Sequence, residues 1–257
     1  MGFTDAVAQD IGTFIACIPS LGEAVNPVQL DQFSDLPWLS ISEEVSIHTV
    51  SSPHEIQSAC LNVLQQVSDD DSTLYVGFNM EWEFSTGLVG TGPRKTSLVQ
   101  IALPTTVYLL QVYHLQHLPS SLKTLLHPSQ IIKIGHNIGA DLAKLAHDFP
   151  DFTLPGKKKQ TYAGVVELGK LAAEKNAVFS GNASLAAITP GSLGQYLSKE
   201  HQTSEWGLST LTDDQKQYAA LDAQVALQNF DVLKNSEKIG KPLSAVTPVG
   251  QLVSLFV

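Results

Sequence analysis

Two polar residues end a strongly apolar stretch, LYVGFNMEWEF, at a spacing that suits metal chemistry. If residues 74–84 form a strand, Asn79 and Glu81 point to the same face, because side chains at i and i+2 share a face. Paired carboxylates at the end of a core strand are suitable ligands for hard divalent cations. Here one member of the pair is an amide, which offers one neutral oxygen and is a poorer ligand. The pattern indicates half of a metal site in which one carboxylate is replaced.

Two further carboxylates stand where secondary structure could bring them to such a site. Asp141 falls in the first turn of a predicted helix that directly follows the strand-like segment 131–137. Asp222 lies inside another predicted helix, with Tyr218 one turn earlier on the same face. The helical neighbours of Asp222 are mostly apolar, and an inward carboxylate is costly unless it is paired or binds a metal. Taken alone, Asp222 fits equally well as a carboxylate bonded to a neighbouring element. Without Asp222 beside it, Tyr218 is more simply a core aromatic.

The segments that must position these residues show either the two-residue period of a strand or the 3.6-residue period of a helix. Apolar runs and alternation predict strands at 45–50, 74–84, 96–103, 106–112 and 131–137, and helical spacing predicts helices at 54–67, 115–127, 139–149, 162–175 and 213–235. Thr212, followed by two acidic residues, is the expected N-cap of the last helix. This order predicts a single α/β domain: a mixed sheet with a three-strand antiparallel start and further parallel strands, flanked by helices. We expect the domain to cover 45–236, between an N-terminal extension (1–44) and a C-terminal tail (237–257).

Composition narrows the classes of function. Of the 257 residues, 43% are hydrophobic and 16% charged, which fits a folded globular chain, and no apolar run approaches the ~18 residues of a membrane span. Two cysteines and no basic signal region favour a reducing, intracellular location, the nucleus or the cytoplasm. The net charge is −10 and Arg94 is the only arginine, so metal ions must supply much of the positive charge if the chain handles nucleic acid. The short basic clusters Arg94–Lys95 and Lys157–Lys159 are more simply solvated loop charges.

A glycine-rich stretch, GLVGTG at 87–92, could be mistaken for a phosphate-binding loop. Nucleotide-binding loops of that kind connect a strand to a helix, whereas this one leads from one predicted strand into another. We therefore expect no dinucleotide or P-loop cofactor site.

Taken together, GFNMEW, GHNIGADLAKL and LTDDQKQYAALDAQVAL resemble the three motifs of the DEDDy 3′–5′ exonucleases. The resemblance is closest to the branch of the Werner-syndrome helicase exonuclease domain, with RNase D as a wider relative. KTSLVQIAL and SEWGLS resemble further segments of that family, and the likeness covers roughly 45–236. The joint set is far more specific than any one motif. It implies an RNase H-like fold.

The resemblance also implies a site and a reaction. Glu81, Asp141 and Asp222, with residue 79, would hold two Mg²⁺ or Mn²⁺ ions, and Tyr218 would orient the attacking water. One ion would help to deprotonate that water and the other would stabilise the leaving 3′-oxygen. The substrate would be the 3′ end of DNA or RNA, single-stranded or recessed, and the products nucleoside 5′-monophosphates.

Four neighbours of these residues are expected to be structural. His136 and Asn137 match the family pattern but stand at the end of a strand beside the site. Met80 and Trp82 are expected in the core or the wall of the site.

Asn79 is the one departure from the family pattern, which has aspartate at this position. We expect weaker metal binding and a rate lower by orders of magnitude, because a misplaced cation no longer stabilises transition-state charge. Since Glu81, Asp141, Tyr218 and Asp222 all remain, a deliberate replacement that traps a bound state is favoured over natural decay of an enzyme. Both explanations predict poor turnover.

Two other functions remain open. The same fold could serve as a catalytically inactive nucleic-acid-binding or scaffold protein that contacts a protein partner through the N-terminal extension. A third possibility is an unrelated metal-dependent phosphohydrolase that cleaves mononucleotide esters and ignores polynucleotide ends.

Overall fold

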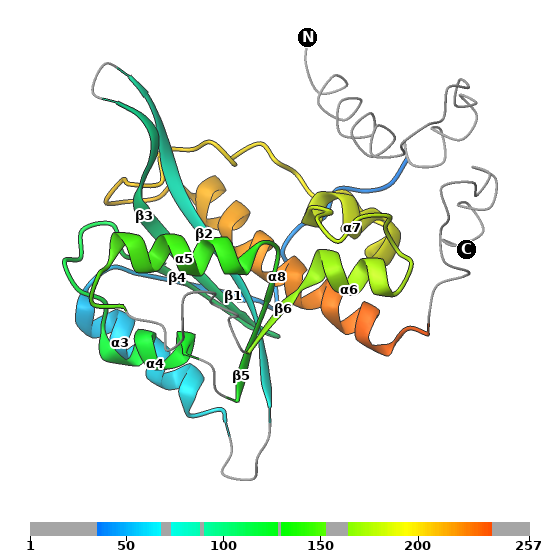
Figure 1. Ribbon diagram of the computed structural model, residues 1–257, viewed down its shortest axis with the longest axis horizontal. Helices are drawn as coiled ribbons and strands as arrows, with labels where there is room; N and C mark the ends of the chain where they lie inside the picture. The colour runs from blue at the N-terminus through cyan, green and yellow to red at the C-terminus, as the bar shows by residue number, and fades with distance from the viewer. Residues whose placement is uncertain (1–34, 68–72, 88–89, 128–129, 153–163, 238–257) are drawn as a thin grey trace. The chain divides into compact units, whose positions relative to one another are not determined.

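The computed structural model describes residues 35–67, 73–87, 90–127, 130–152 and 164–237 (Figure 1). The chain divides into two compact units. The larger comprises Ser40–Glu167 and Lys199–Leu227, and the smaller the described parts of Met1–Leu39, Leu168–Ser198 and Gln228–Val257. Most of the predicted N-terminal extension, the cluster Lys157–Lys159 and the tail after residue 237 lie outside the described residues.

A six-stranded mixed sheet forms the centre of the larger unit, in the order β1-β4-β3-β2-β5-β6. Its strands are β1 (Ser46–Val50), β2 (Leu74–Gly87), β3 (Gly90–Leu103), β4 (Thr106–Gln111), β5 (Ile131–Gly135) and β6 (Val165–Glu167). β2, β3 and β4 pair antiparallel, whereas β1, β5 and β6 join as parallel strands. The predicted α/β fold, with an antiparallel start followed by parallel strands, is confirmed.

Local sequence signals define where the helices begin. The helices with residues in the larger unit are α3 (Pro53–Leu64), α4 (Ser120–Leu126), α5 (Ile138–Asp148) and the first part of α8 (Asp213–Asn235). Ser52 and Glu55 form a reciprocal capping box at the start of α3. Thr212 and Gln215 do the same for α8, since each backbone N–H donates to the other side chain. The predicted N-cap role of Thr212 is confirmed.

Each face of the sheet has its own hydrophobic core, because successive side chains of a strand point to opposite faces. On β3, Val99 and Ile101 pack with α3, α4 and α5, whereas Leu98 and Ala102 pack with α8 and the segment before it. Figure 1 shows α5 crossing one side of the sheet and the first part of α8 on the other.

This alternation decides which side chains of β2 meet α8. Phe78 and Met80 belong to the core beneath α5, so Gly77, Asn79 and Glu81 face the α8 side. At Gly77 the backbones come very close: a Cβ there would lie 1.9 Å from the carbonyl oxygen of Ala223. Glycine at this position therefore permits the close approach of α8 to the strand that carries the candidate ligands.

The smaller unit is mainly helical. It contains α6 (Leu168–Glu174), α7 (Leu185–Leu193) and the last part of α8. Asn229 of α8 donates from Nδ2 to Thr189 Oγ1 at 3.1 Å, and the rings of Trp38 and Tyr196 lie 5.5 Å apart.

Several element boundaries differ from those predicted. The helix expected at 162–175 is instead the short strand β6 followed by α6, and α7 was not predicted. A three-residue strand is too short for its periodicity to be read. The helix expected from residue 115 begins only at Ser120, after Pro119. β2 and β3 extend to Gly87 and from Gly90, so the glycine-rich stretch lies within a strand–strand hairpin, as expected. No helix among the described residues is long and apolar enough to cross a membrane.

Candidate active site

The end of β2 presents Asn79 and Glu81 on the α8 side of the sheet. Asn79 Nδ2 donates a long hydrogen bond of 3.4 Å to Glu81 Oε1. The Glu81 side chain is buried, with 8% of its surface exposed. The pairing of β2 with β3 shifts directly after Glu81, which pairs with Leu98 while Trp82 pairs with Thr96. Such bulges re-aim side chains, and this one falls at the candidate site.

Asp141 lies in the first turn of α5 and is 5% exposed. Asn137 precedes the helix in the left-handed conformation (φ 59°, ψ 29°), which asparagine tolerates better than most residues. The backbone N–H of Gly139 donates to Glu167 Oε1, on β6, at 3.1 Å. Burial raises the pKa of the Asp141 carboxyl to about 8, and the negative charge of Glu167 adds to this effect.

Asp222 and Tyr218 share one face of α8 and are hydrogen-bonded to each other. Burial raises the pKa of Asp222 to about 7, and the bond from the Tyr218 hydroxyl opposes this shift. The pKa of Tyr218 is itself raised above its ordinary value, first by burial and then by the charges of Asp222 and Glu81. Tyr218 therefore keeps its proton at neutral pH.

Three carboxylates from three elements interact at this point. The pKa of Glu81 lies well above its ordinary value, chiefly because of burial, and then because of the charges of Asp222 and Asp141. The structure thus brings the carboxylates of Asp141 on α5 and Asp222 on α8, predicted from separate motifs, within electrostatic range of Glu81 on β2. Buried negative charges repel each other and lose hydration, so their ionised forms need a nearby positive charge.

The donor chemistry of this group fits a hard divalent cation, which prefers carboxylate and amide oxygens. Within the ranges that the structure describes, however, no three His, Cys, Asp or Glu side chains stand at the spacing of a metal site. The charges of Asp222 and Asp141 therefore act on Glu81, but the described carboxylates do not stand at the spacing of a metal site.

Two aromatic rings hold Tyr218 in place. Its ring centroid lies 5.9 Å from that of His201 and 6.0 Å from that of Trp206. Two hydrogen bonds connect the loop that carries Trp206 to the sheet. Gly207 N–H donates to Glu83 Oε1 at 2.9 Å, and Gln111 Nε2 donates to the Leu208 carbonyl at 2.9 Å. The SEWGLS segment thus positions the tyrosine.

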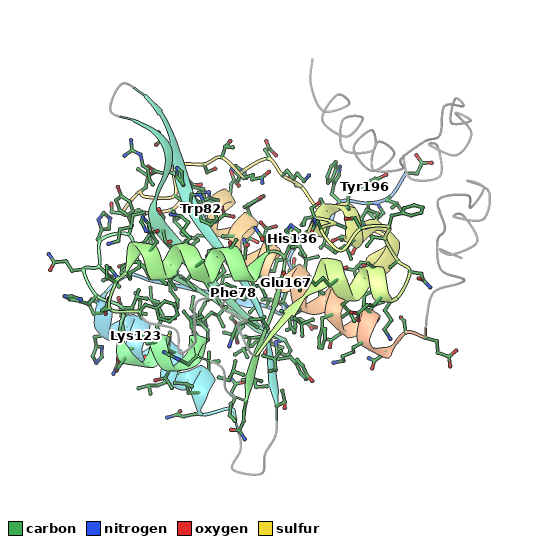
Figure 2. The ribbon with its side chains drawn as sticks, in the orientation of Figure 1. Phe78, Trp82, Lys123, His136, Glu167 and Tyr196 are labelled. Carbon is green, nitrogen blue, oxygen red and sulfur yellow. The ribbon has the colours of Figure 1, made fainter. Side chains whose placement is uncertain are left out.

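Three of the residues expected to be structural, Met80, Trp82 and Asn137, lie in the core or at a helix end. Met80 is buried in the core beneath α5, and Trp82 packs against the same core with Lys144 Nζ 5.2 Å from its ring centroid. Figure 2 labels Phe78 and Trp82, which share this side of β2. Asn137 is the N-cap residue of α5. Arg94 forms an ion pair with Glu83 at 3.5 Å.

Sequence reasoning missed Glu167 and His201 as neighbours of the site. Glu167 belongs to the short β6, which was predicted as helix, so its place at a strand end could not be seen. His201 lies in an irregular segment whose path is decided by tertiary packing. Gly77 carried a weak signal, because an isolated glycine in a strand often marks a close approach of another backbone.

A family model of 3′–5′ exonucleases matches residues 47–237. Among curated proteins, the chain is similar to the 3′-5′ exonucleases of Drosophila sechellia (29% identical over 208 residues) and Drosophila willistoni (30% over 215 residues). Each match covers 79% of this chain and 56% of the relative. The chain therefore spans little more than half the length of these curated relatives.

Solved structures share the fold. The Nibbler EXO domain of Aedes aegypti has a TM-score of 0.60 at 23% identity, with 86% of this chain and 99% of that one covered. The RNase D of Trypanosoma brucei has a TM-score of 0.59 at 17% identity, with 79% and 66% covered. Both support the RNase H-like assignment of the mixed sheet. With the family match over most of its length, the chain belongs to the 3′–5′ exonuclease family.

Proposed function

We propose that this chain is built as a metal-dependent 3′–5′ exonuclease, which hydrolyses the terminal phosphodiester of DNA or RNA and releases nucleoside 5′-monophosphates. The observation that carries the proposal is the burial of three carboxylates on β2, α5 and α8, with the charges of Asp222 and Asp141 both acting on Glu81. A buried group of this kind is a candidate functional site because structural carboxylates are normally exposed or paired with cations.

In this proposal Glu81, Asp141 and Asp222, with Asn79, hold two Mg²⁺ or Mn²⁺ ions. Bound ions of this class supply positive charge for the phosphate and the leaving oxygen and lower the pKa of water. The protonated Tyr218 hydroxyl, fixed by His201 and Trp206, orients the attacking water rather than acting as a base.

Asn79 makes this form of the enzyme slow. Its amide donates to Glu81 Oε1, so it occupies a carboxylate oxygen that a cation would otherwise use. It also leaves the site one negative charge short. We expect turnover reduced by orders of magnitude relative to a chain with aspartate at this position.

A single-stranded or recessed 3′ end is the proposed substrate. The Trypanosoma brucei RNase D structure is a complex with RNA U12, and that of Brucella melitensis NrnC contains pGG. Both proteins share this fold, and their ligands are short nucleic acids. The motif resemblance to the Werner-syndrome helicase exonuclease branch keeps DNA as an equal candidate. The buried thiol of Cys60, which forms no disulfide, fits a reducing compartment and therefore an intracellular substrate.

The test compares this chain with its Asn79→Asp variant. Both would be incubated with 5′-labelled single-stranded and recessed DNA and RNA in Mg²⁺, Mn²⁺ or EDTA. Stepwise shortening from the 3′ end, largely confined to the Asn79→Asp protein and abolished by EDTA, is expected. Cleavage of mononucleotide esters with intact polynucleotides would support a phosphohydrolase instead.

A catalytically inactive nucleic-acid-binding protein is the second candidate. It is favoured by the absence, among the described residues, of three ligands at metal-site spacing, and by the Asn79–Glu81 bond. An Asn79→Asp protein that binds single-stranded oligonucleotides but shortens none of them would establish this alternative.

A further inference from the structure

The helix that carries Asp141 does not cap its own N-terminus. A helix leaves its first backbone N–H groups without internal partners, and an N-cap side chain usually accepts from one of them. Asn137 holds the N-cap position of α5, but its side chain makes no capping hydrogen bond in the described structure. The N–H of Gly139, two residues before Asp141, instead donates to Glu167 Oε1 at 3.1 Å. The acceptor comes from the end of β6, an edge strand beside β5.

The other end of α5 is anchored by a comparable contact. Asp148 Oδ2 accepts from both the backbone N–H and the hydroxyl of Thr96 on β3, each at 2.7 Å. Lys144 Nζ donates to the same carboxylate at 2.8 Å. Carboxylates thus connect both ends of α5 to the sheet, and the Glu167 contact is the one next to Asp141.

We propose that Glu167 is a positioning residue for the exonuclease site: its hydrogen bond to Gly139 fixes the first turn of α5 and thereby the place of the Asp141 carboxylate. The inference rests on the proposed role of Asp141 as a metal ligand. Outer contacts of this kind orient ligands, and their loss typically weakens metal binding about 10- to 100-fold. Figure 2 labels Glu167, together with His136 from the turn between β5 and α5.

The acceptor oxygen, rather than the negative charge, is what this role requires. The negative charge of Glu167 opposes ionisation of Asp141, and the ionised form is the one that would bind a metal. A role that depended on this charge would therefore weaken Asp141 as a metal ligand. Nor does Glu167 complete a metal site, since no three His, Cys, Asp or Glu side chains stand at metal-site spacing in the described part of the chain. Glutamine keeps an acceptor oxygen at the same reach and should therefore replace Glu167 with little loss.

The experiment uses the full chain and three substitutions. Glu167→Gln keeps the acceptor without charge, Glu167→Asp keeps the charge on a shorter side chain, and Glu167→Ala removes both. Hydrogen exchange of residues 138–141 reports the anchoring, and Mn²⁺ titration by calorimetry reports the ligand. We expect Glu167→Ala and Glu167→Asp to speed exchange and weaken Mn²⁺ binding about 10-fold. Glu167→Gln should stay within about twofold of the parent.

The matched control is Glu55→Ala, which removes the carboxylate that accepts from the Ser52 N–H in the capping box of α3, a helix without a candidate ligand. Glu55→Ala should leave the Mn²⁺ affinity unchanged. If Glu167→Ala folds poorly, the comparison of Glu167→Gln with the parent still tests the inference. Equal losses in Glu167→Gln and Glu167→Ala would overturn the inference, as would faster exchange with unaltered Mn²⁺ affinity. A chain that binds no Mn²⁺ even with Asn79→Asp would instead overturn the proposed function.

Discussion

At the scale of single residues, the site is defined by carboxylates that are more easily protonated than usual. The pKa of Asp141 rises to about 8 and that of Asp222 to about 7, in both cases chiefly through burial. An ion that favours the deprotonated forms would lower these pKa values again, because it stabilises the charge that burial disfavours. The protonation of Asp141 and Asp222 and the binding of a cation should therefore depend on each other.

The metal-free protein should lose stability as the pH rises. Since the folded chain holds protons on Asp141 and Asp222 that the unfolded chain releases near pH 4, stability falls between about pH 4 and 8. Asp148, whose pKa is lowered, acts in the opposite sense but only below this window. We expect Tm in EDTA to be lower at pH 8 than at pH 5.5 by roughly 5 °C or more.

Mn²⁺ at ~100 times its Kd should raise the free energy of unfolding by about 2.7 kcal/mol, and this effect should be larger at pH 8 than at pH 5.5. Calorimetric melts at both pH values check this expectation. Asp222→Asn should make the Tm in EDTA depend less on pH. A Tm that rises with pH in EDTA would contradict it.

Tyr218→Phe should separate chemistry from folding. The ring keeps its contacts with His201 and Trp206, so stability should change little, whereas the hydroxyl that bonds Asp222 is lost. In the Asn79→Asp background we expect a rate about 100-fold lower or more. Single-turnover assays measure the rate, and urea unfolding verifies the fold. A rate unchanged by the substitution would exclude a role for the hydroxyl.

At the scale of elements, the site depends on how closely α8 approaches β2. The two backbones meet at Gly77 and Ala223, and Ala223 directly follows Asp222. Any side chain at position 77 would move Asp222 away from Glu81. The same contact accounts for a residue without a side chain at position 77, on the α8 side of β2, while the α5 side bears Phe78 and Met80.

Gly77→Ala should therefore impair both stability and function. Its Cβ would lie 1.9 Å from the Ala223 carbonyl oxygen, a backbone atom that cannot move alone. We expect a loss of about 1–3 kcal/mol in the free energy of unfolding and weaker Mn²⁺ binding.

Gly181→Ala is the matched control, because its added Cβ would meet nothing closer than 3.4 Å. Urea titration should show a change within about 0.5 kcal/mol for that variant. Equal stability of the two variants would disprove the close-approach explanation.

At the scale of the whole molecule, the charge limits how nucleic acid can be held. The net charge is −10, and the only arginine is paired with Glu83. Contacts between basic side chains and phosphates can therefore be few, and binding must depend on bound cations and on the terminal nucleotides.

Binding of a single-stranded oligonucleotide should accordingly respond more to divalent ions than to monovalent salt. We expect affinity to fall with a log–log salt slope of roughly −2 or shallower, as for two or three phosphate contacts. EDTA should abolish most of the binding. Fluorescence anisotropy with a 3′-ended oligonucleotide, against one blocked by a 3′-phosphate, measures both effects. A steep slope that persists in EDTA would indicate a basic surface instead.

The sequence alone predicted the regular elements and the chemistry of the candidate site. Long periodic segments such as β4, α5 and α8 were predicted because burial of one face imposes a fixed spacing of apolar residues. Asn79 and Glu81 stood out by their i, i+2 spacing at a strand end, and Asp222 by its apolar helical neighbours. The site roles of all five residues, with Asp141 and Tyr218, came from the resemblance of their motifs to the exonuclease family.

Only the tertiary structure decided what surrounds these residues. β6 is too short for any periodicity, and the path of the loop through His201 and Trp206 depends on contacts with distant strands. The bond from Gly139 to Glu167 joins residues 28 positions apart, and the approach of α8 to Gly77 joins residues farther apart still. Local sequence encodes such contacts only weakly, because they form when separate elements pack and their geometry is set by the whole core. The sequence therefore determined which groups could do the chemistry, and the packing of the sheet with α5 and α8 determined which of them meet.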